Sequence, residues 1–342
     1  MQTVLVSGNQ GYIGSVLVKK LVDAGYKVIG LDTGFFDSHK FVPELVKPHL
    51  QIKKDVRDVV VEDLEGIDAV IHLAAISNDP MGSLLPEITY DINHRGSVHL
   101  AQCAKAGGVK RFLFSSSCSM YGIAQEDLVS EEATFNPQTP YAESKVFAER
   151  DISKMADDYF APVFLRNSTV FGVSPRMRFD LVVQNLAAYG YLDGVIRIMS
   201  DGTPWRPLIH IEDVSEAFCF LLKADRSAVF NQAFNVGNKE NNIQVKTIAE
   251  YVKDVIPNTT IEINDSNQDD SRSYKVDFSK IYNLGFAPKW SVLNGVQELY
   301  ETFKKIDFTV EQFVSDDFIR LRKYKRLLDG KMITSDFRLT TV

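Results

Sequence analysis

Tyr141 and Lys145 stand four residues apart in residues 141–159, a stretch whose pattern favours a helix. Positions i and i+4 share one helix face, so the phenol and the ammonium are predicted to project together. A nearby ammonium stabilises a phenolate and lowers the tyrosine pKa, which makes the phenol a usable acid or base near neutral pH. Ser117, at the end of an apolar run, offers a hydroxyl to the reacting oxygen. When such a Tyr–Lys pair occurs alone, it usually lies on a solvent-exposed helix face. The glycine turn described next favours the catalytic interpretation here.

Three glycines, Gly8, Gly11 and Gly14, lie between the first apolar run and the first expected helix. Glycines there permit a tight turn and let the backbone approach a pyrophosphate, while the helix N-terminus offers free N–H groups. Asp32 ends the next apolar run. In dinucleotide sites, a carboxylate at this position accepts hydrogen bonds from the ribose hydroxyls and repels a 2′-phosphate. No basic residue follows until Lys40, so NAD is favoured over NADP. The residues predicted to bind the cofactor here are Gly8, Gln10, Gly11, Tyr12, Ile13, Gly14 and Asp32.

Two later segments fit the same crevice, which forms at the carboxyl ends of parallel strands. Asp55 and Val56 follow the third expected strand and are predicted to flank the adenine. Leu73, Ala74 and Ala75 follow the fourth, and their small side chains admit the cofactor backbone.

Short apolar runs alternate with helix-length segments, such as residues 85–107 and 141–159, through the first half of the chain. This alternation is typical of βαβ units and of a parallel sheet buried on both faces. It predicts an α/β fold, a Rossmann-type doubly wound parallel sheet with a smaller mixed α/β C-terminal substrate lobe. The expected boundaries are 1–171 plus about 208–240 for the cofactor domain, about 172–207 and 241–305 for the lobe, and 306–342 for a C-terminal helical extension.

The extension carries apolar and basic residues together in residues 310–328. This pattern favours a surface helix with a solvated basic face, and a role in subunit contacts is the alternative.

Composition narrows the classes of function. The chain has 342 residues, of which 45% are hydrophobic and 24% charged, and a net charge of −7, which argues against a dedicated nucleic-acid binder. Three scattered cysteines predict neither a disulfide framework nor a zinc site, and no metal is expected. No apolar run reaches the ~18 residues that a membrane span needs. The N-terminus lacks the features of a signal peptide, so a cytoplasmic location is expected.

These motifs together resemble the extended short-chain dehydrogenase/reductases, specifically the NAD-dependent sugar-nucleotide epimerase/dehydratase family, from about Thr3 to Phe303. The resemblance implies that Ser117, Tyr141 and Lys145 are catalytic and that Ser117 also contacts substrate. It implies as well that Tyr141 and Lys145 contact the cofactor, with Lys145 holding the nicotinamide ribose. It further implies that Asn93 matches a family asparagine near the cofactor, that Arg206 and Arg272 contact a nucleotide-diphosphate sugar, and that the protein is a homodimer.

Several positions depart from the family pattern. Dehydratases of the family carry acids directly after the catalytic hydroxyl residue, where this chain has Cys118 and Ser119, so dehydration is not expected. Both residues are expected to contact substrate, and Cys118 is either an acid/base group or a small residue lining the pocket. Thr169 replaces the usual substrate-contacting asparagine, and Asn78 is a candidate sugar contact.

The resulting prediction is a nucleotide-sugar epimerase acting at C4 through a transient keto sugar. A 4-dehydrogenase or 4-ketoreductase of the same family is the alternative, and a non-catalytic NAD-sensing protein is a weaker one.

Overall fold

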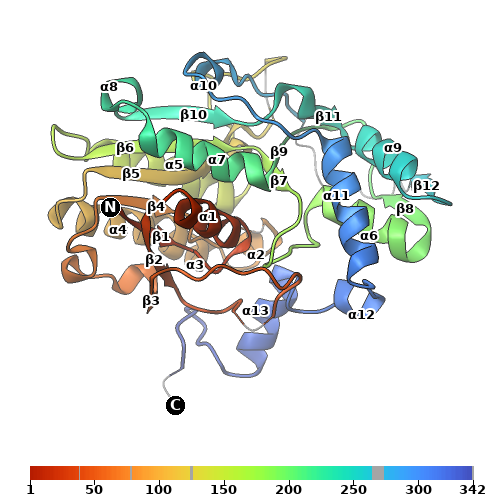
Figure 1. The fold of residues 1–342 in the computed structure, drawn as a ribbon, viewed down its shortest axis with the longest axis horizontal. Coiled ribbons are helices and arrows are strands. Elements are labelled where there is room, and N and C mark those ends of the chain that lie inside the picture. Colours follow the sequence, from red (N-terminus) through yellow and green to blue (C-terminus); the bar gives the residue numbers. More distant parts are fainter. Residues whose placement is uncertain (38, 78, 124–125, 264–272, 341–342) are drawn as a thin grey trace.

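A seven-stranded parallel sheet forms the larger part of the protein (Figure 1), whose computed structural model describes residues 1–37, 39–77, 79–123, 126–263 and 273–340. The strand order is β10-β6-β5-β4-β1-β2-β3. Every residue of β4 and β6 is buried, as a parallel sheet covered on both faces requires. The predicted doubly wound sheet is therefore confirmed. Its strands are β1 (Thr3–Ser7), β2 (Lys27–Asp32), β3 (Leu50–Lys53), β4 (Ala69–His72), β5 (Arg111–Ser117), β6 (Ala161–Asn167) and β10 (Gln232–Val236).

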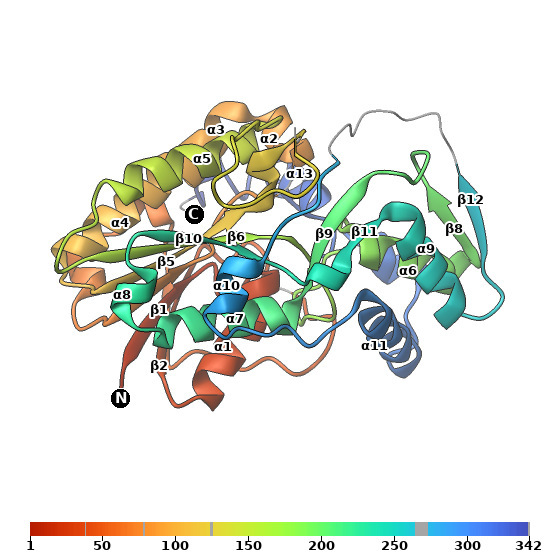
Figure 2. The ribbon, with the colours of Figure 1, turned by 90° about the horizontal axis from the view of Figure 1, so that it is seen from above.

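Helices cover both faces of this sheet (Figure 2). One face carries α1 (Tyr12–Asp23), α7 (Ile211–Lys223), α8 (Arg226–Val229) and α10 (Ser279–Asn283). The other carries α2 (Asp79–Leu84), α3 (Pro86–Tyr90), α4 (Gly96–Ala106) and α5 (Pro140–Ser153).

Two of these helices differ from the sequence-based ranges. The helix expected over residues 85–107 is divided, because a π-helical turn at Asp91–Arg95 joins α3 to α4. α5 starts within one residue of the predicted 141–159 range but ends at Ser153, earlier than predicted. Pro140 occupies its first turn, and the Thr139 hydroxyl accepts a hydrogen bond from the Ala142 N–H at 3.2 Å. This cap fixes the first turn of the helix, on which Tyr141 lies.

A smaller lobe lies beyond the carboxyl ends of the strands (Figure 2) and confirms the predicted mixed α/β unit. Its three-stranded sheet has the order β11-β9-β7, and a separate parallel pair joins β12 to β8. The lobe contains β7 (Thr169–Phe171), β8 (Val195–Ile198), β9 (Trp205–His210), β11 (Asn242–Gln244), β12 (Thr260–Ile263), α6 (Val182–Asp193), α9 (Val245–Val255) and α11 (Val292–Lys305).

The C-terminal extension forms α12 (Val310–Phe313) and α13 (Arg320–Asp329) and then turns back along the protein. Phe308, Phe313 and Phe318 pack into the main core. Tyr324 and Phe337 belong to a separate apolar cluster with Ile76 and Met81. The expectation of a solvated basic face is wrong for two of the basic residues, because Arg320 and Lys323 are both buried.

None of the helices in the described ranges is both long enough and apolar enough to cross a membrane.

Candidate active site

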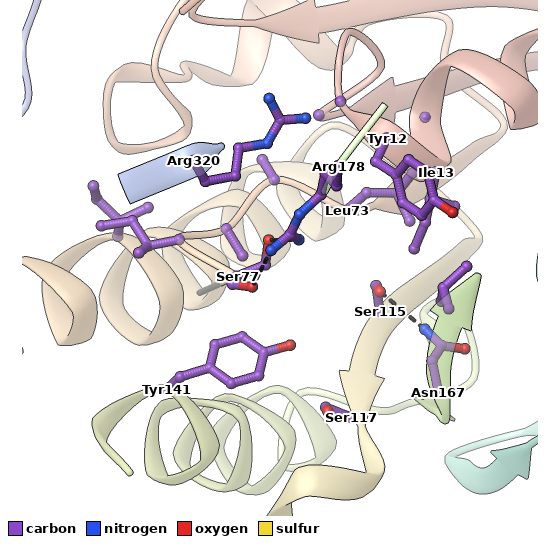
Figure 3. Close-up of a pocket in the computed structure, with 18 of the residues that line it drawn as sticks. Tyr12, Ile13, Leu73, Ser77, Ser115, Ser117, Tyr141, Asn167, Arg178 and Arg320 are labelled. Carbon is purple, nitrogen blue, oxygen red and sulfur yellow. Dashed lines mark hydrogen bonds between the residues drawn. The ribbon is translucent and has the colours of Figure 1, made fainter. Parts of the chain in front are cut away.

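A cavity of about 450 Å³ opens at the carboxyl ends of the parallel strands, beside the smaller lobe. Figure 3 shows Tyr141 and Ser117 directed toward one space, with Arg178 and Arg320 on its opposite side. The chain therefore brings together, in one hollow, residues that are more than a hundred positions apart in the sequence.

The glycine turn forms one wall of this cavity, through Gly8, Gly11 and Gly14. Gly8 has a φ of +73°, and a Cβ there would lie 2.7 Å from the Ala74 nitrogen. A Cβ on Gly14 would lie 2.2 Å from the Gly8 carbonyl oxygen. Two of these positions thus exclude any side chain, which leaves the N-terminus of α1 open to an anion.

Asp32 lies at the end of β2 and lines the cavity next to this turn. Its carboxylate accepts hydrogen bonds from the Gln10 N–H at 3.1 Å and the Gly34 N–H at 2.9 Å. Burial raises the pKa of Asp32, and the two N–H donors oppose that shift. The backbone thereby holds the carboxylate in place at the position where ribose hydroxyls are expected.

Tyr141 and Lys145 lie on the same face of α5, as predicted, and both line the cavity with Ser117. The Lys145 Nζ donates a hydrogen bond to the Ser115 carbonyl at 2.7 Å and lies 5.9 Å from the centre of the Tyr141 ring. Burial lowers the pKa of Lys145 to about 7. Burial also raises the pKa of Tyr141 to about 12, and the Ser117 hydroxyl gives the largest opposing effect. The predicted lowering of the Tyr141 pKa is not found in this structure, because burial outweighs the opposing effects and Lys145 is itself only partly charged near neutral pH.

The other predicted cofactor residues divide into two groups. Tyr12, Ile13, Val56, Leu73, Ala74 and Ala75 line the cavity. So does Asp55, but its carboxylate forms an ion pair with Arg57 at 2.8 Å.

Gln10 and Asn93 do not line the cavity in the described residues. Gln10 contributes its N–H to Asp32, as described above. The fully buried Asn93 amide exchanges hydrogen bonds with the backbone of Ile76, at 2.8 and 2.9 Å. The structure therefore does not support the predicted contact between Asn93 and the cofactor. Asn93 instead holds the loop after β4 through its hydrogen bonds to Ile76.

On the substrate side, Ser119, Thr169 and Arg206 line the cavity as predicted. The predicted contacts Asn78 and Arg272 lie outside the described residues. Ser116, Ser119 and Asn167 each carry a buried polar atom without a hydrogen-bond partner among the described residues. Because buried polar atoms are normally paired, these three oxygens favour a ligand rich in hydroxyl groups.

Cys118 contradicts its predicted substrate contact. Its thiol is 1% exposed, does not line the cavity in the described residues, and donates to the Arg166 carbonyl at 3.1 Å. Burial raises the pKa of the thiol well above its usual value, so the group stays protonated and is no acid/base catalyst. A short 3-10 turn over Cys118–Tyr121 follows β5 and directs Cys118 to the core, while Ser117 and Ser119 line the cavity.

We therefore expect Cys118→Ala to keep kcat within about two-fold of the parent and to lower the free energy of unfolding by about 1 kcal/mol. Steady-state kinetics and denaturant unfolding measure the two quantities. A hundred-fold fall in kcat with normal stability would restore Cys118 as a reacting group.

The cavity-wall residues that sequence analysis missed include Arg178, Tyr274, Arg320 and Tyr324. Arg178 forms an ion pair with Asp180 at 2.8 Å and donates to the Ser77 hydroxyl at 2.9 Å. A Pro- and Arg-rich stretch over residues 172–207 was the available signal for Arg178. For Arg320 and Tyr324 the signal was the mixture of aromatic and basic residues in the extension.

Residues 4–237 match the model of the NAD dependent epimerase/dehydratase family. The chain belongs to this family. One relative, UDP-glucose 4-epimerase from Lactobacillus helveticus, is 32% identical over 282 residues, which cover 75% of this chain and 83% of the relative. Another relative, UDP-glucuronic acid decarboxylase 1 from Arabidopsis thaliana, is 30% identical over 312 residues, which cover 88% of this chain and 69% of the relative.

Among solved structures, a UDP-glucose 4-epimerase from Thermotoga maritima with UDP-glucose is similar, with a TM-score of 0.77 and 26% identity. The match covers 89% of this chain and 99% of that chain. Family membership makes the protein an NAD-dependent enzyme of the short-chain dehydrogenase/reductase type. The glycine turn and Asp32 fit that cofactor, since they offer an anion site and a ribose acceptor in one cavity.

Proposed function

We propose that this enzyme is a nucleotide-sugar epimerase that inverts C4 through a transient keto sugar. The observation that carries the proposal is the common cavity of Ser117, Tyr141 and Lys145 with the glycine turn. When bound, NAD accepts a hydride from the sugar and later returns it. The proposed cofactor residues are Gly8, Gly11, Tyr12, Ile13, Gly14, Asp32, Val56, Leu73, Ala74, Ala75 and Lys145.

Tyr141 is the proposed proton-transfer group. With a pKa of about 12 it starts as a phenol, so removing a hydroxyl proton requires positive charge beside the ring. Lys145 supplies that charge whenever it is protonated, and its pKa of about 7 makes its charge responsive near neutral pH. The Ser117 hydroxyl acts on the same phenol and holds the reacting oxygen by a hydrogen bond.

Substrate is proposed to lie along Ser119, Thr169 and Arg206, with the unpaired oxygens of Ser116 and Asn167 facing its hydroxyls. An arginine is suited to a diphosphate because its guanidinium offers several donors in a plane. The relatives named above act on UDP-glucose or UDP-glucuronic acid, so a nucleotide-diphosphate sugar is the proposed substrate class.

The carboxylates on the cavity wall argue against dehydration. In the described ranges these are Asp32, Asp55, Asp79 and Asp180. Backbone N–H groups hold Asp32, and Arg57 and Arg178 hold Asp55 and Asp180. Asp79 accepts a hydrogen bond from the Thr139 hydroxyl at 2.8 Å. Each carboxylate is thus already occupied in holding the structure.

The contribution of the C-terminal extension to the proposed cofactor end supports epimerisation over net oxidation or reduction. Tyr324 and Phe337 of the C-terminal extension line the cavity together with Asp32 and Val56. An epimerase returns its hydride and keeps its cofactor, whereas a 4-dehydrogenase or 4-ketoreductase must exchange it every turnover.

The test uses the enzyme as purified, without added cofactor. We expect NAD in the ligand released on denaturation, and a nucleotide sugar converted to its C4 epimer with no net absorbance change at 340 nm. Stoichiometric gain or loss of NADH would instead assign a dehydrogenase or ketoreductase. Loss of carbon dioxide from a UDP-uronic acid would assign a decarboxylase.

We also propose the division into residues 1–171 plus about 208–240, about 172–207 plus 241–305, and 306–342, adjusted so that β7 and β9 belong to the smaller lobe and α10 to the cofactor domain. A homodimer in the cytoplasm is proposed as well. Sedimentation velocity measures the oligomeric state, and a monomer at micromolar concentration would contradict the dimer.

A further inference from the structure

Arg320 is a buried guanidinium that reaches the cavity from the C-terminal extension. It opens α13, is 6% exposed, and lines the cavity together with Asp32 and the glycine turn. Figure 3 shows its side chain on the side of the cavity opposite Tyr141. The side chain is held by the Phe36 ring, whose centre lies 3.8 Å from the guanidinium carbon.

This charge has no close counter-ion among the residues that the structure describes. Its guanidinium donates a hydrogen bond to the Arg176 carbonyl at 3.4 Å. Asp32 and Asp180 act on it only at longer range, and Arg178 repels it. Burial lowers the pKa of Arg320 to about 10, so at neutral pH the group remains a cation.

The other buried arginines near the site differ in this respect. Arg178 has Asp180, and Arg57 has both Asp55 and Asp91. A buried charge without a partner is costly, and removal of its partner from a buried pair usually costs several kcal/mol. A cation that is kept buried on a cavity wall therefore indicates that an anion enters the cavity.

We infer that Arg320 binds the diphosphate of the NAD cofactor, so that the C-terminal extension is part of the cofactor site. The inference rests on the cofactor placement proposed above and does not depend on which sugar reacts. Arg320 lies opposite the N-terminus of α1 in this scheme, and the two would hold the diphosphate between them.

Position favours the cofactor over the substrate as the source of this anion. Arg320 contacts the Phe36 ring from the loop after β2, and Arg178, Asp180, Tyr324 and Asp32 act on it at longer range. Phe36 and Asp32 belong to the adenosine half of the cavity, whereas the proposed substrate contacts Thr169 and Arg206 lie on strands of the smaller lobe and are not among these neighbours. The match to the Thermotoga maritima enzyme covers 99% of that enzyme but 89% of this chain. About a tenth of this chain therefore has no counterpart in that enzyme.

The test compares Arg320→Gln with Lys325→Gln, which removes a charge from an exposed position on the same helix. Calorimetric titration of the cofactor-stripped proteins with NAD, ADP-ribose, adenosine and UDP separates the sources. We expect Arg320→Gln to weaken NAD and ADP-ribose by about 10- to 100-fold, which is the effect of losing hydrogen bonds to a charged group. Adenosine, which has no phosphate, and UDP are expected to bind as before, and Lys325→Gln to match the parent throughout.

Three outcomes would overturn the inference: unchanged NAD affinity in Arg320→Gln, a loss confined to UDP, or an equal loss for adenosine. Thermal unfolding of the stripped variants checks that the fold is intact. If Arg320→Gln unfolds, Arg320→Lys keeps the charge but not the planar donors, and it must still bind NAD more weakly than the parent. Failure of the parent itself to bind NAD would instead contradict the cofactor placement.

Discussion

Replacing Tyr141 with phenylalanine is expected to lower kcat by about 1,000-fold, within the 10²- to 10⁴-fold range of general acid–base catalysis. The change removes one oxygen from a side chain on the cavity wall and keeps the ring against α5. The removed oxygen is the one on which the Ser117 hydroxyl acts, in a ring whose centre lies 5.9 Å from the Lys145 Nζ. NAD affinity is expected to change little, because the main proposed cofactor contacts lie on β1, α1 and β2.

The measurement is single-turnover conversion of the nucleotide sugar, with NAD content and melting temperature recorded for the same preparations. Tyr300→Phe, on α11 away from the cavity, is a control for the loss of a phenol and should keep full activity. Retention of more than a tenth of the parent rate by Tyr141→Phe would exclude the tyrosine as the proton-transfer group.

Replacing Gly14 with alanine is expected to weaken NAD binding by at least 100-fold. The new Cβ would lie 2.2 Å from the Gly8 carbonyl oxygen and 2.7 Å from the Asn9 Cα. Both atoms belong to the backbone of the turn, so the turn must open rather than a side chain rotate. Opening it moves the N–H groups that meet the diphosphate, and overpacking of this kind also costs about 1–3 kcal/mol of stability.

A matched control separates turn geometry from general strain. Gly25 has a φ of +84° and open space where a Cβ would be built. Gly25→Ala is therefore expected to cost about 1 kcal/mol for the left-handed backbone, with NAD affinity unchanged. Titration with NAD and denaturant unfolding measure both effects. Equal NAD affinity in Gly14→Ala and the parent would show that the turn does not hold the cofactor.

Local signals were enough to predict the sheet and the residues at its edge. The apolar runs of β1, β2, β4 and β5 are short and buried, and each ends in residues that reach the cavity. Parallel strands place their carboxyl ends along one edge of the sheet, so recognising the strands was enough to predict that Asp32, Ala74 and Ser117 line the same edge. The four-residue spacing of Tyr141 and Lys145 was likewise a local signal, because positions i and i+4 share one face of a helix.

Long-range packing explains what the sequence did not reveal. Cys118 was expected in the pocket because it adjoins Ser117, but the short turn after β5 directs its thiol to the core. Arg320 is almost 290 positions from Asp32, and no periodicity in the extension predicts that Phe36 would shelter its charge. The pKa of Tyr141 depends on how deeply several elements together bury the phenol. The four-residue spacing of Tyr141 and Lys145 gives no information on that burial.

The C-terminal position of Arg320, Tyr324 and Phe337 has a consequence for the order in which the enzyme is made. Translation releases the N-terminal part first, so the glycine turn and Tyr141 leave the ribosome well before α13. For that interval the adenosine end of the cavity lacks Arg320, Tyr324 and Phe337. We therefore expect tight cofactor binding to begin only after the C-terminal extension has left the ribosome and folded, so a chain that is truncated before α13 should bind NAD weakly.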